Sequence, residues 1–128
     1  IGRKLKLCYE PLNVSCVTDE KWLLFVIEQV LSNSLKYTRA GSITIELEAP
    51  KTLVIRDTGI GVAPEDLPRI FEKGYTGYNG RGDQKASGLG LYLCRTICKR
   101  LGHTITASSV PDHGTAIRIT LEQRQVRE

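Results

Sequence analysis

Apolar and polar side chains alternate with a period of two, or form short apolar runs, in several segments of the chain. Both patterns are typical of β-strands with at least one buried face. Two successive segments separated by a short turn are expected to pair in antiparallel fashion. Lys4 to Glu10 and Val14 to Val17 are expected to form such a hairpin at the edge of the domain. Ser42 to Glu48 and Thr52 to Arg56 are expected to form a second antiparallel pair. We predict strands over Lys4 to Glu10, Val14 to Val17, Ser42 to Glu48, Thr52 to Arg56, His103 to Ser109, and Thr115 to Leu121.

Two other segments follow the helical period of 3.6 residues. The first is predicted from about Glu20 to Tyr37, because Thr18 and Asp19 precede it as capping residues and acidic residues fill its first turn. The second begins near Gly88 and ends at Gly102, a typical C-terminal stop. At about 100° per residue, one side of the first helix is predicted to face the core; it carries Leu23, Leu24, Ile27, Val30, Leu31, Ser34 and Leu35.

The opposite side of the first helix gathers four polar residues within about one third of the circumference. Gln29 and Asn33 offer amide oxygens, and a neutral oxygen is a suitable ligand for a hard cation such as Mg²⁺. Lys36 offers a positive charge for phosphate, and Tyr37 a flat ring for a base. A polar helix face is most often simply solvated. The composition of this one is more specific than solvation requires.

The stretch DTGIG, from Asp57 to Gly61, follows directly on an apolar strand. A carboxylate at a strand end is a fixed acceptor that suits an exocyclic amine such as that of adenine. Gly59 and Gly61 tolerate positive φ and allow close approach to the backbone. An ordinary turn would also explain Asp-x-Gly, so the motif gains meaning only together with the others.

A long glycine-rich loop with little apolar periodicity spans Glu72 to Ser87. Loops of this length inside a compact domain are typically lids or binding loops. The helix that follows opens with Gly88, Leu89 and Gly90. Its first backbone N–H groups lie at the positive end of the helix dipole, where phosphate binds readily.

Length and composition are those of one compact globular domain covering residues 1–128. The net charge of +4 favours an anionic ligand or partner. Without a dense basic run, the sequence does not single out nucleic acid, and we expect no nucleic-acid partner. Among the four cysteines, Cys94 and Cys98 fall one helical turn apart, and we interpret them as small buried hydrophobes. The chain does not begin with Met, so we expect it to be part of a larger protein.

Four ordered motifs make the chain similar to a known family. They are SNSLKYT, DTGIG, IFEKGYTG and SGLGLYL, followed by the closing strand GTAIRITL. Together they resemble the asparagine, first glycine, phenylalanine and second glycine boxes of the ATP-binding catalytic domain of bacterial sensor histidine kinases. This family belongs to the superfamily that includes gyrase, MutL and the heat-shock chaperone ATPases. The residues in and around the last two boxes resemble those of small Gram-positive kinases that respond to cell-envelope peptide antibiotics.

The resemblance implies a two-layer α/β sandwich of the Bergerat type, with a mixed, mainly antiparallel sheet and helices on one face. It implies ATP and Mg²⁺ as ligands and residues 72–87 as a mobile ATP lid. Asn33 would ligate Mg²⁺, and Asp57 would receive the adenine amine. Lys36 would contact phosphate, Tyr37 would flank the adenine, and Thr115 would approach the adenine end of the site. Gly59 and Gly61 would shape the pocket. Gly88, Leu89 and Gly90 would cradle the phosphates at the start of the second helix.

Three features depart from the family pattern. Gln29 stands where the asparagine box usually has its first Asn, and Ala86-Ser87 stands where Gly-Thr is common. No segment resembles the helical hairpin that carries the phosphoacceptor His. No catalytic residue is therefore assigned, with Gln29 and Lys36 as the candidates.

The activity that the resemblance implies is phosphoryl transfer from Mg-ATP to a His on a separate dimerisation domain, and from there to a response regulator. The parent protein would be a membrane-anchored homodimer, with this domain in the cytoplasm. Two alternatives stay open: an ATP-hydrolysing machine of the same superfamily and a non-catalytic nucleotide-binding module. The hydrolysing enzymes place a general-base Glu one turn before the metal Asn; here that residue is Gln29, whose amide cannot accept a proton in this way.

Overall fold

The computed structural model of the chain describes residues 4–9, 19–38, 40–48, 51–75 and 89–121. Within these ranges lie five strands, two α-helices and one short 3-10 helix. The predicted strand Val14 to Val17 and most of the predicted lid lie outside the described residues. Among the described residues, no helix combines the length and the hydropathy needed to span a bilayer.

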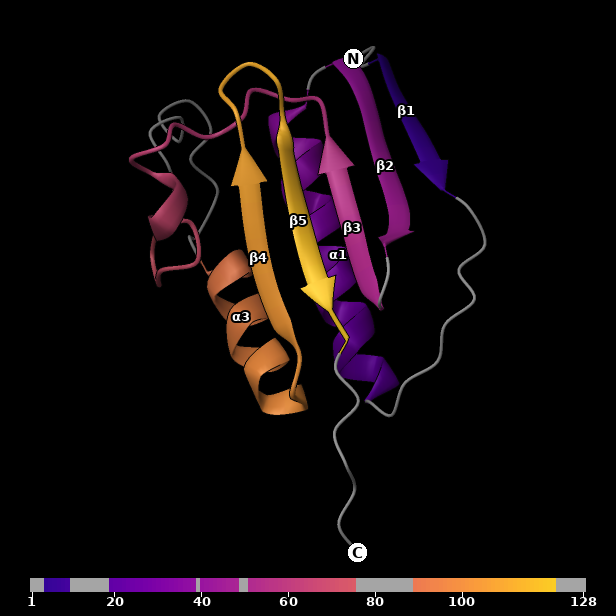
Figure 1. Ribbon diagram of the computed structural model, residues 1–128, viewed down its shortest axis with the longest axis vertical. Coiled ribbons are helices and arrows are strands. Elements are labelled where there is room, and N and C mark those ends of the chain that lie inside the picture. Colours follow the sequence, from indigo (N-terminus) through magenta and orange to yellow (C-terminus); the bar gives the residue numbers. More distant parts are fainter. Residues whose placement is uncertain (1–3, 10–18, 39, 49–50, 76–88, 122–128) are drawn as a thin grey trace, which may run out of the picture.

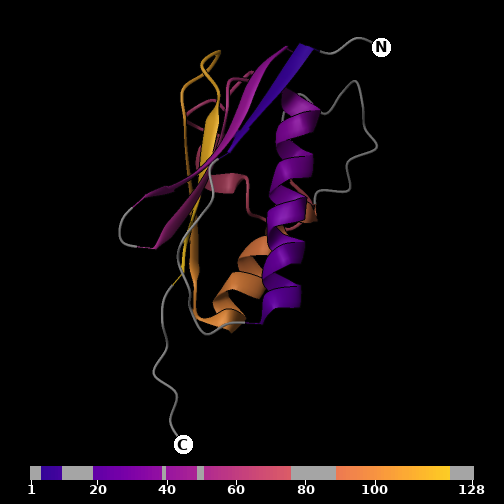
Figure 2. The same ribbon diagram turned by 90° about the vertical axis from the view of Figure 1, so that its right-hand side faces the viewer.

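The strands form one sheet in the order β1-β2-β3-β5-β4. Only β1 and β2 are parallel, and the other neighbours are antiparallel. Figures 1 and 2 show α1 and α3 together on one face of this sheet. The predicted two-layer sandwich with a mixed, mainly antiparallel sheet is therefore confirmed. The strand bounds are β1 (Lys4–Tyr9), β2 (Ala40–Glu48), β3 (Thr52–Asp57), β4 (Thr104–Ser109) and β5 (Thr115–Thr120).

The edge strand β1 pairs in parallel with β2, with Lys4 opposite Ala40 and Tyr9 opposite Ile45. Parallel neighbours need a long crossover connection, and the segment that contains α1 supplies it. We had expected β1 to pair with Val14 to Val17, which the structure does not describe. The pairing with β2 was not predicted, because local alternation carries no information about a partner 36 residues away.

Helix α1 (Glu20–Tyr37) has the predicted bounds, and Asp19 caps it by accepting hydrogen bonds from the N–H groups of Lys21 and Trp22. Its buried face differs from the predicted one. Val26, Val30 and Ser34 are buried, whereas Leu24 is 52% and Leu35 42% exposed. Apolar side chains are spread around much of this helix, so its own pattern did not decide which part would meet both the sheet and α3.

Helix α3 (Gly90–Leu101) buries two cysteines rather than leucines. Cys94 and Cys98 are 0% and 1% exposed and carry free thiols, while Leu93 is 38% exposed. The Cys94 thiol points at the Val26 carbonyl of α1, 3.7 Å away. The small sulfur side chains let the two helices pack closely, which confirms the interpretation of these cysteines as buried hydrophobes. Gly102 ends the helix in the left-handed conformation, as predicted.

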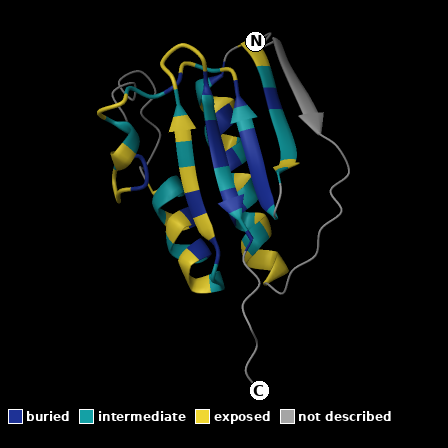
Figure 3. Ribbon diagram, in the orientation of Figure 1, coloured by how far each residue is buried: buried dark blue, intermediate teal, exposed yellow. Residues whose placement is uncertain are grey.

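The central strand β3 is buried on both faces, as the dark blue band in Figure 3 shows. Its inward residues pack under the helices, but Val54 faces away from them and is still 0% exposed. Val54 lies between Glu46 and Arg118 in the strand register. Long charged side chains can cover apolar surface with their stems while their heads remain in water.

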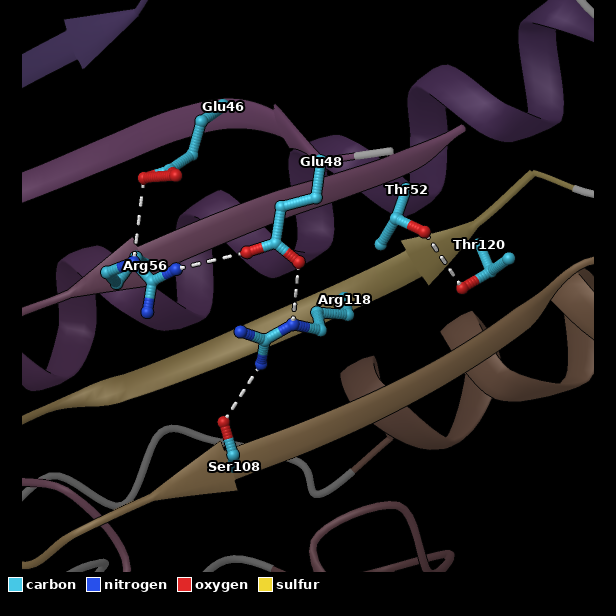
Figure 4. A network of polar contacts seen from close by, with 7 residues as sticks. All are labelled: Glu46, Glu48, Thr52, Arg56, Ser108, Arg118 and Thr120. Atoms are coloured by element: carbon cyan, nitrogen blue, oxygen red, sulfur yellow. Dashed lines mark hydrogen bonds and ion pairs between the residues drawn. The ribbon is translucent and has the colours of Figure 1, made fainter. Parts of the chain in front are cut away.

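A chain of ion pairs holds these charged side chains over the outer face of the sheet (Figure 4). The Glu48 carboxylate contacts Arg56 at 3.6 Å and Arg118 at 3.3 Å, and Arg56 also contacts Glu46 at 3.6 Å. Arg118 donates a further hydrogen bond to the Ser108 hydroxyl at 3.0 Å. Because these groups are well exposed, each pair contributes little by itself. Together they give the sheet a polar outer surface.

The burial of Cys94 and Cys98 predicts that their thiols react slowly with alkylating reagents in the folded protein. Loss of hydration raises the pKa of Cys94 to about 12 and that of Cys98 to about 11, and the neighbouring sulfur adds to the effect on Cys94. Alkylation requires the thiolate, so iodoacetamide in mildly alkaline buffer should leave both residues unmodified in the folded protein. In concentrated urea both should react fully. Peptide mapping by mass spectrometry distinguishes them from Cys8 and Cys16; rapid native labelling of Cys94 would contradict the buried packing.

Candidate functional site

The Asp57 carboxylate is buried where three elements meet. It lies at the end of β3, is 7% exposed, and its Oδ1 accepts hydrogen bonds from two backbone N–H groups. These belong to Gly59 at 2.9 Å and to Thr115, at the start of β5, at 3.2 Å. The side chain of Ser34 on α1 also hydrogen-bonds to the carboxyl group. The acceptor is therefore fixed in position before any ligand arrives.

Burial raises the pKa of Asp57 above its ordinary value, chiefly because the charged form loses hydration. The hydrogen bonds from Gly59, Thr115 and Ser34 act in the opposite direction and offset the effect only in part. A further donor would therefore lower the cost of keeping this carboxylate charged. An exocyclic amine of a bound base is such a donor, so the electrostatics fit the predicted role of Asp57.

The loop after β3 is held against the end of α1. A Cβ on Gly59 would lie 2.3 Å from the Tyr37 carbonyl oxygen, and the Ile60 N–H donates to this same oxygen at 3.3 Å. Gly61 adopts a positive φ of 76°, and a Cβ there would lie 2.4 Å from the Val110 carbonyl oxygen. The space beside both glycines is thus taken by the protein's own backbone, whereas we had expected them to let a ligand approach.

The polar residues of α1 lie closer to the core than predicted. Asn33 and Tyr37 are half-buried and border the stripe of Val26, Val30 and Ser34, while Lys36 is exposed. The Lys36 ammonium is 5.9 Å from the centre of the Tyr37 ring. The prediction that these polar residues lie fully opposite the core was therefore wrong, because the buried stripe runs along Val26, Val30 and Ser34. This places Asn33 and Tyr37 at the boundary between protein and solvent.

The start of α3 faces the middle of α1. The Gln29 side-chain oxygen lies 3.1 Å from the position that a Cβ on Gly90 would occupy. The helix starts after Leu89 without a side-chain cap, and its first internal bond runs from the Leu93 N–H to the Leu89 carbonyl at 2.8 Å. Gly88, which we expected to join Leu89 and Gly90 in a phosphate cradle, lies outside the described residues.

These contacts bring several of the predicted site residues together from distant parts of the sequence. Along α1, Gln29 meets the start of α3, Ser34 meets Asp57, and Tyr37 meets the loop at Gly59. Figure 1 shows the C-terminal ends of α1 and β3 and the start of β5 at the same end of the molecule. A half-buried polar helix edge, a buried acceptor and a helix N-terminus together suit a nucleotide.

Two residues of this site were missed in the sequence. Ser34 was assigned to the core, although a single hydroxyl within an apolar stripe is itself a signal of a buried polar contact. Ser109, at the end of β4, was not singled out at all. It lies beside Thr115 and contacts the same loop as Asp57 does. Only the strand register reveals its position.

A comparison with protein families supports the geometry. The model of the family described as histidine kinase-, DNA gyrase B- and HSP90-like ATPase matches residues 18–125. The sensor histidine kinase YxdK of Bacillus subtilis is 41% identical over 121 residues, which are 88% of this chain and 37% of YxdK. The sensor histidine kinase GraS of Staphylococcus haemolyticus is 38% identical, covering 88% of this chain and 33% of GraS. The chain thus spans about a third of these relatives.

Solved structures share the fold. A mycobacterial sensor histidine kinase, MprB, superimposes with a TM-score of 0.79 at 24% identity, covering 96% of this chain and 85% of that one. Full-length ShkA in complex with AMPPNP gives a TM-score of 0.75 at 22% identity, covering 91% of this chain and 25% of that one. At these identities the likeness establishes the architecture alone.

The raised pKa of Asp57 predicts a pH-dependent effect of Asp57→Asn on stability. A carboxyl whose folded pKa exceeds its unfolded value stabilises the fold while it is protonated. That contribution to stability is lost as the pH rises from the pKa of the unfolded state through the pKa of the folded state. Relative to the variant, the wild-type free energy of unfolding should therefore fall across the mildly acidic range, by about 1.4 kcal/mol for each unit of pKa difference. Urea unfolding at several pH values measures this. A wild-type protein that became more stable relative to the variant as the pH rises would contradict this prediction.

Proposed function

Since the chain belongs to the family of histidine kinase-, DNA gyrase B- and HSP90-like ATPases, we propose that it binds ATP with Mg²⁺ and transfers the γ-phosphoryl group to a histidine on a separate dimerisation domain of the same sensor kinase. The observation that carries the proposal is the buried Asp57 acceptor, surrounded by donors from α1, β5 and the following loop. The relatives that match most of the chain are named as sensor histidine kinases, which supports the same activity.

We assign the nucleobase to the end of the site at β3. Asp57 would accept a hydrogen bond from the exocyclic amine of adenine. This additional donor would stabilise the charged carboxylate, whose pKa is raised by burial. The half-buried ring of Tyr37 would flank the base, and Thr115 would approach it from β5. Gly59 and Gly61 act indirectly in this scheme, because they let the loop pack against α1 and Val110 and so keep Asp57 in place.

We assign the phosphates to the half-buried polar edge of α1 and the start of α3. Asn33 would offer its amide oxygen to Mg²⁺, with Gln29 one turn earlier as a second amide. When bound, Mg²⁺ would neutralise phosphate charge that the protein alone leaves unbalanced. Lys36 would add a point charge, and the first N–H groups of α3, at Leu89 and Gly90 with Gly88, would donate to phosphate oxygens.

In this scheme the domain contributes chiefly by positioning and charge neutralisation, as is usual for phosphoryl transfer. The acceptor histidine lies on another part of the parent protein, for which we propose a membrane-anchored homodimer with this domain in the cytoplasm. The phosphoryl group would pass on to a response regulator. Residues 72–87 would close over the nucleotide as a lid. Sensing of a cell-envelope peptide antibiotic would belong to the parent protein.

A hydrolysing ATPase is the second candidate, and one observation weighs against it. At the position of the general base the chain has Gln29, which faces Gly90 and cannot take a proton from water. The neighbouring Glu28 is exposed on another side of α1. Rapid ATP hydrolysis by the domain, abolished in Glu28→Gln, would establish this alternative. A domain that forms acid-labile phosphate only after its dimerisation domain is added would establish the kinase.

The Asp57 assignment predicts a loss of affinity in Asp57→Asn. An amide oxygen is a weaker acceptor than a carboxylate for the base amine. Because hydrogen bonds to charged groups contribute about 1.5–3 kcal/mol, ATP should bind about ten- to a hundredfold more weakly. Calorimetric titration in the presence of Mg²⁺ measures this. Asp19→Asn, the same chemical change at the cap of α1, should bind ATP like the wild type; equal affinities in Asp57→Asn and the wild type would rule out the adenine role.

The Asn33 assignment predicts that Mg²⁺ no longer strengthens nucleotide binding in Asn33→Ala. The experiment titrates a non-hydrolysable ATP analogue with and without Mg²⁺. In the wild type, affinity should rise markedly with the metal, and in the variant the two curves should coincide. Ser32→Ala is the matched control, because Ser32 is the preceding, exposed residue of the same helix. An Asn33→Ala protein that keeps the full effect of Mg²⁺ would exclude Asn33 as its ligand.

A further inference from the structure

Three polar side chains form a row across the end of the sheet. Asp57 on β3 lies directly opposite Thr115 on β5, and Thr115 lies directly opposite Ser109 on β4. Residues that are directly opposite in neighbouring strands project from the same face. This row therefore lies on the face covered by α1, where Asp57 meets Ser34. Ser109 is the member of the row farthest from Asp57.

The Ser109 hydroxyl joins the loop after β3 to the turn between β4 and β5. It accepts a hydrogen bond from the Val62 N–H, in the loop after β3, at 2.7 Å. It donates to the Gly114 carbonyl, in the turn between β4 and β5, also at 2.7 Å. Its oxygen is 3.1 Å from the hydroxyl oxygen of Thr115, and either of the two could be the donor of that bond.

The number of hydrogens available determines which of the two hydroxyls, Ser109 or Thr115, donates. A serine hydroxyl has one hydrogen and two lone pairs. The hydrogen of Ser109 is used on Gly114, whose carbonyl can only accept, and one lone pair is used on Val62. The remaining lone pair can only accept from Thr115. The single hydrogen of Thr115 therefore points at Ser109, and only lone pairs of its hydroxyl remain for other partners.

The surrounding backbone keeps this arrangement from relaxing. The Asp112 N–H donates to the Ile60 carbonyl at 2.7 Å, which ties the β4–β5 turn to the loop after β3 a second time. A Cβ added to Gly114 would clash with the Asp57 carbonyl oxygen. The turn, the loop and the end of β3 can thus shift only together. The direction of the Thr115 hydroxyl is fixed with them.

We propose that Ser109 is a positioning residue that holds the Thr115 hydroxyl as a pure acceptor, and that it thereby favours a base carrying an amine over one carrying a carbonyl at the edge facing Asp57. Asp57 and Thr115 would both present acceptors to that edge. An amine matches them, whereas the carbonyl of hypoxanthine would meet lone pairs on both sides. The inference rests on the proposed binding of ATP and adds the residue that sets base preference.

The test compares ATP and ITP, which differ at this edge of the base. Both are titrated with Mg²⁺ into the wild-type domain and into Ser109→Ala, Ser109→Thr and Ser108→Ala. In Ser109→Ala the Thr115 hydrogen is released and can donate to a carbonyl. The ratio of ATP to ITP affinity should then fall about five- to tenfold, the effect of one hydrogen bond. Ser109→Thr keeps the hydroxyl and should restore the ratio.

Ser108→Ala is the matched control, because Ser108 points to the outer face and bonds to Arg118 instead. Its ATP-to-ITP ratio should equal that of the wild type. An unchanged ratio in a folded Ser109→Ala protein would overturn the inference and leave Ser109 a purely structural role. Binding of neither nucleotide by the wild type would instead overturn the proposed function, and this inference with it.

A second variant makes the test independent of whether Ser109→Ala folds. Thr115→Val removes the hydroxyl at nearly constant volume. If Thr115 only accepts at the C6 position of the base, this variant should weaken ATP binding more than ITP binding, so that the ratio of ATP to ITP affinity falls as it does in Ser109→Ala. If the ratio stayed the same or rose, Thr115 would not be a pure acceptor in the wild type, and the proposed role of Ser109 would be wrong.

Discussion

The carboxylate of Asp57 is 7% exposed, so it needs hydrogen-bond donors from the protein to compensate for its lost hydration. Those donors come from Gly59, Thr115 and Ser34, which belong to a loop, a strand and a helix that are far apart in the sequence. Satisfying one acid therefore requires that β3, β5 and α1 meet at one end of the sheet. The other features of the site follow from that meeting.

The loop that follows Asp57 shows how little freedom remains there. Gly59 is pressed against the carbonyl of Tyr37, and Gly61 against that of Val110. The glycines serve the packing of the protein against itself, and through it the direction of Asp57. Such a site is pre-organised: its acceptors are oriented in the absence of a ligand, so that binding costs less in ordering.

The two faces of the sheet differ in what covers them, and the proposed site lies at one end of the inner face. On the inner face, apolar side chains and the cysteines of α3 pack under the helices and hold the functional edge of α1 in place. On the outer face, Glu48 bridges two arginines above Val54, so a strand that is buried on both sides needs no second layer of helices. In the part of the chain that the structure describes, the proposed binding groups lie where the inner face, α1 and the loops come together.

The sequence by itself determined the local elements and the residues of the proposed site. Helix α1, the strands from β2 to β5 and the motifs around Asn33, Asp57 and Gly90 follow from short-range patterns of polarity, capping and turn residues. The tertiary structure alone decided which side of α1 is buried, that β1 pairs with β2, and that Ser109 lies beside Thr115. These features depend on contacts between segments distant in sequence, and a local pattern that leaves several faces equally apolar cannot specify such contacts.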